Sequence, residues 1–300
     1  MKFKIRRILT ILLLILLFGI GLFSHFVAPY AVLQPWRANC DADPTTMGLN
    51  SKKVHITTGD GVELQGYFIQ PNRQPRAIMI LIHGIGGCKE GYLGLADRLA
   101  KSGYASYLFD NRAQGKSGGK YCSYGFYEKG DIQGIIGRAR QKFPDLPIGV
   151  WGNSLGGAIA LQTLAIDDRL SFGVVESTFG SLGDIVYEYQ KRYLKGVGLR
   201  PITDYALYRA GKIANFPPSE VCPADVAAAI HQPVLLAHGD ADPNIDIRHG
   251  KEIYKNLASE GKEWVEVSGG GHSNLFAIGG EAYAERIMSF IARQVGHVAR

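Results

Sequence analysis

The stretch that decides the fold is IGVWGNSLGGAIALQTLAI, residues 148–166. A short apolar run ends in Gly152-Asn-Ser154-Leu-Gly156, and an apolar stretch with helical spacing follows directly. This pattern predicts a buried strand, a tight turn and a helix, with the serine on the turn. Small flanking residues allow a bend sharp enough to lift the serine hydroxyl clear of a sheet. We therefore predict that Ser154 is a nucleophile.

The same five-residue pattern occurs again at Gly115-Lys-Ser117-Gly-Gly119. The pattern alone is weak evidence in a chain with 38 glycines. The second copy follows its predicted strand by several residues and has no helical spacing directly after it. We interpret it as a loop.

A serine nucleophile needs backbone donors for the oxyanion that its attack creates. The Leu155 amide follows Ser154 at the start of the predicted helix, where amides have no intrahelical acceptor. The glycine-rich stretch His83-Gly-Ile85-Gly-Gly87 follows another apolar run and can bend toward the same point. We predict Leu155 and Ile85 as the oxyanion donors and interpret His83 as structural.

The serine also needs a base and an acid that orients the base. His272 lies in a glycine-rich loop after the last apolar run, and Asp240 and Asp242 both follow the run VLLA. We predict His272 as the base and Asp242 as the acid. Asp240 is the alternative acid and otherwise a turn residue.

Short apolar runs rich in Ile, Val and Leu alternate with stretches of helical spacing, which predicts a mostly parallel sheet with helices on both faces. The runs are AIMILI (77–82), YASYLF (104–109), IGVW (148–151), FGVV (172–175), VLLA (234–237) and WVEV (264–267). A hairpin of 54–58 and 62–69 precedes them around an Asp-Gly turn and predicts an antiparallel edge.

One interval, about 178–230, departs from this alternation and contains five tyrosines and a Phe-Pro-Pro break. We predict that it forms a helical cap over the carboxyl edge of the sheet. Its tyrosines are compatible with an amphipathic, partly apolar pocket. Its basic residues are compatible with a surface that faces anionic lipid headgroups. An ordinary packed and solvated helix pair is the alternative for both. The basic residues are Lys191, Arg192, Lys195 and Arg200.

Residues 8–28, ILTILLLILLFGIGLFSHFVA, contain no Asp, Glu, Lys or Arg and follow a basic arm. As a helix they span roughly 30 Å, the thickness of a bilayer core. We predict an uncleaved signal anchor within 1–29, a linker at 30–53 and a catalytic domain at 54–300; a cleaved signal peptide is the alternative. The basic arm predicts a cytoplasmic N-terminus and an extracytoplasmic domain.

The remaining composition excludes some partners. The formal net charge is +6, and the basic arm supplies four of these charges, which argues against nucleic acid as a partner. The four cysteines lack paired metal-ligand spacing, so we predict no zinc site. Cys88 and Cys122 each follow a predicted strand at the same edge of the sheet, so they form a disulfide or remain buried free thiols.

Five motifs occur in the order and spacing of one family. They are HGIGG (83–87), FDNRAQGKSGG (109–119), WGNSLGG (151–157), HGDADPNI (238–245) and GGGHSN (269–274). On these, residues 54–295 resemble the α/β hydrolase superfamily, nearest to its membrane-tethered esterases and acyl-hydrolase-like members. The resemblance implies the α/β hydrolase fold, with nucleophile, acid and histidine at Ser154, Asp242 and His272. Ala113 stands where the family usually has glycine, which predicts an altered loop there.

These observations predict a serine hydrolase that cleaves a carboxylic ester, a thioester or an acyl lipid through an acyl-enzyme. No metal or organic cofactor is expected, because the triad and the oxyanion amides supply the chemistry. One alternative is a non-catalytic scaffold that binds a partner or lipid through its cap. Another is a nucleotide-binding protein, suggested by Gly115-Lys-Ser117, but the first glycine is missing and Asp110 stands where phosphate would lie.

Overall fold

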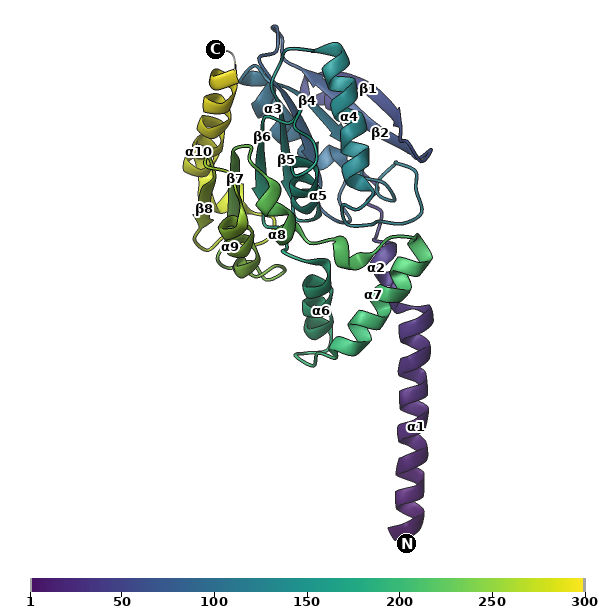
Figure 1. Cartoon of the computed structure of the whole chain (residues 1–300). Coiled ribbons are helices and arrows are strands. Elements are labelled where there is room, and N and C mark those ends of the chain that lie inside the picture. The colour runs from purple at the N-terminus through teal and green to yellow at the C-terminus, as the bar shows by residue number, and fades with distance from the viewer. Residues whose placement is uncertain (1, 299–300) are drawn as a thin grey trace.

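The computed structural model describes residues 2–298 and contains an eight-stranded, mostly parallel sheet (Figure 1). The strands are β1 (Asn50–Thr57), β2 (Glu63–Gln70), β3 (Ile78–Ile82), β4 (Ala105–Phe109), β5 (Ile148–Asn153), β6 (Phe172–Glu176), β7 (Val234–Gly239) and β8 (Glu263–Val267). Their spatial order is β1-β2-β4-β3-β5-β6-β7-β8. Strands β3 to β8 pair in parallel, and β1 and β2 form the antiparallel edge. The predicted fold class is confirmed.

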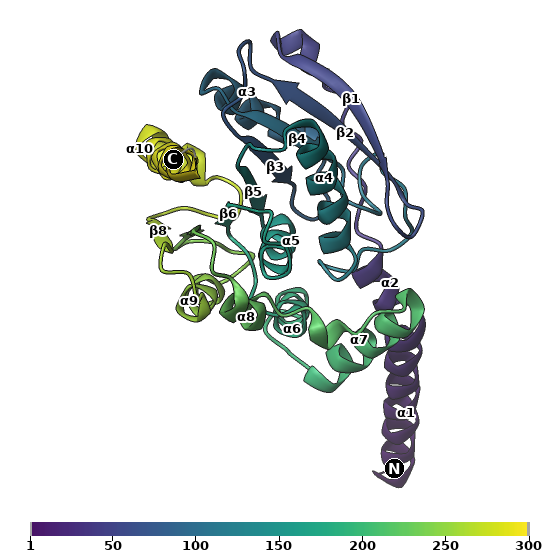
Figure 2. The ribbon, with the colours of Figure 1, turned by 45° about the horizontal axis from the view of Figure 1, so that its top comes forward.

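Helices cover both faces of the sheet (Figure 2). The helices α4 (Glu128–Lys142), α5 (Leu155–Leu164) and α9 (Ile247–Asn256) lie on one face, and α3 (Leu93–Lys101) and α10 (Leu275–Val298) on the other. In β3, Ile78, Ile80 and Ile82 pack toward α4 and α5, whereas Met79 and Leu81 pack toward α3 and α10. Both faces of the strand are therefore buried, which explains its continuous apolar run.

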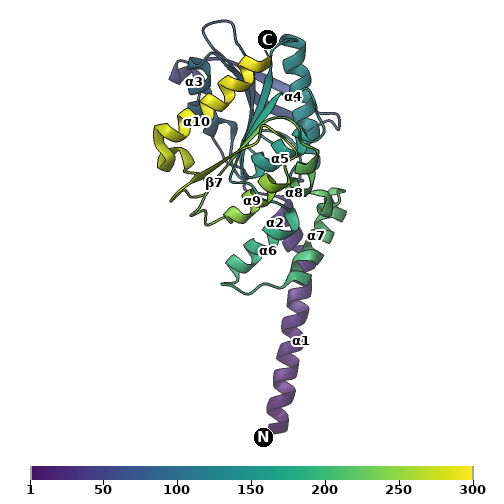
Figure 3. The same ribbon diagram turned by 60° about the vertical axis from the view of Figure 1, so that its left-hand side comes forward.

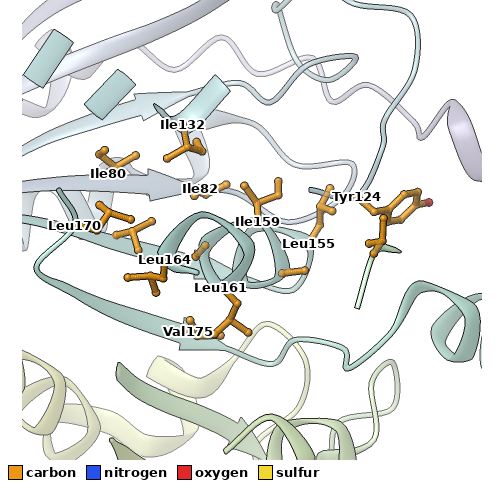
Figure 4. Close-up of a cluster of buried hydrophobic side chains, with 14 of the residues drawn as sticks. Ile80, Ile82, Tyr124, Ile132, Leu155, Ile159, Leu161, Leu164, Leu170 and Val175 are labelled. Carbon is orange, nitrogen blue, oxygen red and sulfur yellow. The ribbon is translucent and has the colours of Figure 1, made fainter. Parts of the chain in front are cut away.

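The hydrophobic core on the face of the sheet covered by α4, α5 and α9 surrounds α5 (Figure 4). All ten residues of α5 are buried, and its two polar side chains, Gln162 and Thr163, donate to backbone carbonyls. Ile159 and Leu161 of α5 pack in the same cluster as Ile80 of β3 and Val175 of β6. The residue just before α5, Ser154, is thus held by one of the most enclosed elements of the molecule.

The interval between β6 and β7 is helical, as predicted. It contains α6 (Leu182–Tyr193), α7 (Arg200–Ala214), the 3-10 turn η3 (Pro218–Glu220), α8 (Pro223–Val226) and the 3-10 turn η4 (Ala227–Ala229). Helices α6 and α7 project beyond the carboxyl ends of the parallel strands, whereas α8 packs against α5 and α9 (Figure 3). Only α6, α7 and the segment between them form the projecting part, which we call the cap.

The chain begins with a long apolar helix, α1 (Lys2–Phe26), which is long and apolar enough to cross a membrane. A second helix, α2 (Ala28–Leu33), turns away from it, and both contact α7 of the cap. The side chains of Val32 and Leu33 are buried. The Tyr124 hydroxyl donates to the Val32 carbonyl, and the Cys122 amide donates to the Leu33 carbonyl. The segment predicted as a linker is therefore packed on the catalytic domain from its first residues.

The alternative of a Cys88–Cys122 disulfide is wrong, and the alternative of a buried free thiol holds for Cys122 but not for Cys88. Cys88 pairs with Cys40, with a Cα–Cα distance of 6.5 Å, and not with Cys122. Cys122 is a fully buried free thiol whose pKa is raised by burial. Cys40 lies between α2 and β1 in a segment without periodicity, so its position next to Cys88 had no local signal in the sequence.

Candidate active site

Ser154 occupies a strained turn between β5 and α5. Its φ of 55° and ψ of −119° lie outside the regions that non-glycine residues ordinarily adopt. Glycines on either side make the turn possible: a Cβ on Gly156 would collide with the Ile82 carbonyl oxygen, and one on Gly152 with the Gly156 carbonyl. The two glycines of the pentapeptide are therefore required by close backbone approach.

The fold brings the three predicted catalytic side chains together at the carboxyl ends of the strands. His272 Nε2 lies 2.9 Å from Ser154 Oγ, and His272 Nδ1 lies 2.8 Å from Asp242 Oδ2. The chain contributes them from three segments that follow β5, β7 and β8. The arrangement has the connectivity that general-base activation of a serine needs.

Asp242 is held as a carboxylate. Its side chain is inaccessible to solvent, and Oδ1 accepts the amides of Asn244 and Ile245 at 2.8 and 3.0 Å. Burial alone would raise the pKa of Asp242, but hydrogen bonds from His238, His272 and the Ile245 amide lower it well below its ordinary value. Asp242 is therefore ionised at neutral pH and fixes the proton of His272 on Nδ1, which leaves Nε2 free to accept.

Asp240, the alternative acid, binds the start of the histidine loop and not the histidine itself. Its carboxylate accepts the Gly269 amide at 2.6 Å and the Ser268 hydroxyl at 3.1 Å. It thereby connects the end of β7 to the start of the loop that carries His272. The geometry favours Asp242 as the partner of the histidine.

The predicted oxyanion donors lie around Ser154. A Cβ on Gly84 would sit 3.3 Å from the Ser154 Cβ, so the loop of residues 83–87 runs against the serine. Leu155 is the first residue of α5. Among the hydrogen bonds of residues 2–298, neither the Ile85 nor the Leu155 amide is a donor. Both amides are therefore open to an acceptor from outside the chain.

A buried polar network holds the oxyanion loop, and sequence reasoning missed most of it. The Lys89 ammonium pairs with Asp110 at 2.7 Å, and the Lys89 amide donates to the same carboxylate at 2.8 Å. The Gly86 amide donates to Gln114 Oε1 at 2.7 Å. His83 accepts the Asn111 amide at 3.0 Å, in keeping with its predicted structural role. The loop after β4 thus supports the loop after β3.

Ala113 belongs to the same supporting loop and adopts a left-handed φ of 60°. Its amide donates to the Gly118 carbonyl at 2.7 Å. Ala113 therefore adopts a left-handed conformation that glycine takes at lower cost.

The cap is fastened to the segment that carries the acid. Arg192 of α6 donates to the Asn244 carbonyl at 2.7 Å, two residues beyond Asp242. Glu188, one turn earlier in α6, lies 3.1 Å from His249 of α9. The position of α6 is therefore coupled to the geometry of the triad.

Comparison with known proteins agrees with this architecture. A family model described as serine aminopeptidase, S33 matches residues 73–178, and one described as the prolyl oligopeptidase family matches residues 145–297, about half of the chain. The chain belongs to the α/β hydrolase superfamily. The matched segments contain β3 to β8 and all the predicted site residues.

Several relatives of this hydrolase span most of its length. The uncharacterized proteins YqkD of Bacillus subtilis and YfhR of Escherichia coli are 26% and 28% identical, covering 79% and 81% of this chain and 77% and 81% of their own. A monoacylglycerol lipase of Mycolicibacterium smegmatis is 29% identical over 60% of each chain. A solved esterase structure from Pyrococcus furiosus superposes with a TM-score of 0.72 at 25% identity, covering 87% of this chain and 98% of the esterase. The esterase and lipase relatives support a hydrolase.

Proposed function

We propose that this protein is a membrane-anchored serine hydrolase that cleaves carboxylic esters through an acyl-enzyme on Ser154. The observation that carries the proposal is the continuous hydrogen-bonded series from Ser154 through His272 to Asp242, at 2.9 and 2.8 Å. The strained backbone at Ser154 supports it, because such strain recurs where a side chain must be presented for chemistry.

The mechanism follows from these contacts. His272 Nε2 accepts the proton of the Ser154 hydroxyl as Oγ attacks the substrate carbonyl. The ionised Asp242 stabilises the imidazolium, and the amides of Leu155 and Ile85 receive the oxyanion. His272 then protonates the leaving alkoxide, and the acyl group remains on Ser154. A water molecule, deprotonated by His272, releases the acid and restores the serine.

We propose an acyl lipid, such as a monoacylglycerol or lysolipid, as the preferred ester. Helix α1 supports this choice, because an enzyme fixed to a bilayer encounters lipid substrates at high local concentration. The monoacylglycerol lipase relative points to the same class. The same chemistry also attacks thioesters, so the assay includes them.

We further propose that α1 is an uncleaved anchor, with its basic arm in the cytoplasm and the catalytic domain on the other side. The Cys40–Cys88 disulfide supports this orientation, because disulfides persist in oxidising compartments. Accessibility of the catalytic domain to protease in intact cells tests the orientation, and a protected domain would contradict it.

The proposed activity is tested with the full chain in lipid nanodiscs. Fluorophosphonate labelling and hydrolysis of a monoacylglycerol, a thioester and p-nitrophenyl esters of graded length are compared for wild type, Ser154→Ala and Ser289→Ala. Ser289 is an exposed serine of α10 and serves as the matched control. We expect Ser154→Ala to lose labelling and roughly 10³-fold or more in rate, with Ser289→Ala unchanged. A folded wild type that neither labels nor hydrolyses any of these substrates would favour the non-catalytic scaffold.

A further inference from the structure

The cap lies beside the outer end of the apolar helix. The apolar run of residues 8–28 spans roughly 30 Å as a helix. Along most of α1 the side chains are exposed, but near its end Ser24 is buried and His25 Nδ1 lies 2.7 Å from the Tyr205 hydroxyl of α7. Because His25 is about one turn from the end of the run, α7 sits where the helix leaves the bilayer core.

The segment between α6 and α7, residues 193–199, is the cap tip. In Figures 1 and 3 it lies at the end of the catalytic domain that reaches furthest along α1 toward the N-terminus. Its large side chains are apolar or aromatic and exposed: Tyr193 (78%), Leu194 (49%), Val197 (57%) and Leu199 (43%). Grouped exposed apolar side chains are unfavourable in water and mark a contact surface.

The charges around the cap tip complement a membrane surface. Lys191 and Lys195 form no ion pair within residues 2–298, whereas Arg200 is neutralised by Asp184 at 2.7 Å and Asp204 at 3.1 Å. Free lysines next to aromatic and aliphatic side chains are typical of segments that lie in the headgroup region, where the stems contact lipid and the ammonium groups reach phosphate.

We propose that the cap tip is a second membrane-contact surface, which enters the interface of the bilayer that α1 crosses, and that Lys195 of the tip and the adjacent Lys191 of α6 bind anionic phospholipid headgroups. The inference rests on the proposed role of α1 as an anchor. Since Arg192 and Glu188 fasten α6 to the segment that carries Asp242, a docked tip holds the triad close to the lipid surface. An acyl lipid then reaches Ser154 from the bilayer without a long passage through water.

Contact with lipid is measured by depth-dependent quenching in nanodiscs that contain phosphatidylglycerol. The full chain carries Cys222→Ser, which removes the half-buried free thiol, and one nitrobenzoxadiazole label at Val197→Cys or at the control Lys101→Cys. Lys101 ends α3 just before β4 begins, at the edge of the sheet opposite the triad, and is 75% exposed. We expect lipid-borne doxyl groups to remove most of the fluorescence of the Val197 label and little of that of the Lys101 label.

Equal quenching of the two labels would overturn the proposal. A blue-shifted Val197 label that lipid-borne doxyl groups do not quench would overturn it in favour of a second copy of the chain covering the tip. Quenching needs no catalysis, so failure of the hydrolase proposal leaves this result interpretable.

The consequence for activity is tested with the double variant Leu194→Asp, Val197→Asp. We expect its KM for a lipid ester in the bilayer to rise roughly tenfold, because two apolar contacts with lipid are lost, with hydrolysis of a short soluble ester unchanged. The conservative pair Leu194→Ile, Val197→Ile is expected to keep the wild-type KM. Equal loss on both substrates would mean that the tip supports the fold rather than the membrane contact.

Discussion

Replacing Asp242 by asparagine tests how the site orients its base. In the Asp242→Asn variant, the side-chain carbonyl oxygen can still accept the amides of Asn244 and Ile245, so the turn that holds the side chain persists. The other position, 2.8 Å from His272 Nδ1, becomes an NH₂ group that donates instead of accepting. His272 must then carry its proton on Nε2, 2.9 Å from Ser154 Oγ, where it cannot act as a base.

The magnitude follows from that change of tautomer. In serine proteases with a Ser-His-Asp triad, substitution of the aspartate by asparagine lowers kcat about 10⁴-fold. This corresponds to roughly 5.5 kcal/mol of transition-state stabilisation. We expect a loss of this order for Asp242→Asn, with little change in KM. The assay is steady-state hydrolysis of a p-nitrophenyl ester by the full chain in nanodiscs.

The matched control is Asp240→Asn, which changes the same residue type two positions earlier. Asp240 contacts only the base of the histidine loop, so we expect a loss within about tenfold, since one charge-assisted hydrogen bond is weakened. If Asp242→Asn retained activity within tenfold of wild type, or if Asp240→Asn were the more damaged variant, our account of the triad would be refuted.

The pH dependence of stability gives a second readout on Asp242. Its folded-state pKa lies below the ordinary value of 3.8, so its ionised form stabilises the fold fully above that pH and less as the pH falls below it. We expect the difference in unfolding free energy between wild type and Asp242→Asn to shrink steadily as the pH falls below 3.8. A difference that stayed constant or grew over that range would contradict the depressed pKa.

Three further changes test the scaffold. Gly156→Ala should lower the free energy of unfolding by about 2 kcal/mol or more, because the new methyl group collides with the carbonyl of β3; a variant that unfolds like wild type in denaturant would contradict the close approach. Cys40→Ser should cost about 4 kcal/mol, the loop entropy of a 48-residue separation, and dithiothreitol should destabilise wild type but not the variant. Lys89→Met should cost roughly 3–5 kcal/mol, because it leaves the buried carboxylates of Asp110 and Glu90 without the ammonium group that pairs with both at 2.7 and 3.0 Å; a variant that unfolds like wild type in denaturant would argue against paired charges.

The sheet and the residues that meet at its carboxyl edge could be predicted from the sequence because their signals are local. Buried parallel strands are continuous apolar runs, and the run at 148–151 is followed at once by the turn of Ser154 and a helix. Asp242 and His272 are predicted in the same way, because each follows the end of a predicted strand. In a parallel sheet those ends share one edge, so residues far apart in sequence become neighbours.

The parts that could not be predicted depend on long-range packing. The path of residues 34–49 determines which cysteine meets Cys88, and that segment has neither apolar periodicity nor a strand. The contact of His25 with Tyr205 joins residues 180 positions apart and depends on the angle between two helices. The pairing of Lys89 with Asp110 likewise became visible only once the two loops were placed side by side.

The proposal that Ser154 is the nucleophile is tested most directly by locating a covalent adduct. The full chain in nanodiscs is treated with a fluorophosphonate, digested and mapped by mass spectrometry. We predict one modified serine per chain, Ser154, and no modification in Asp242→Asn over the same short exposure, because its histidine cannot accept the hydroxyl proton. An adduct on any other residue, or stoichiometric labelling that survives Ser154→Ala, would contradict the proposal.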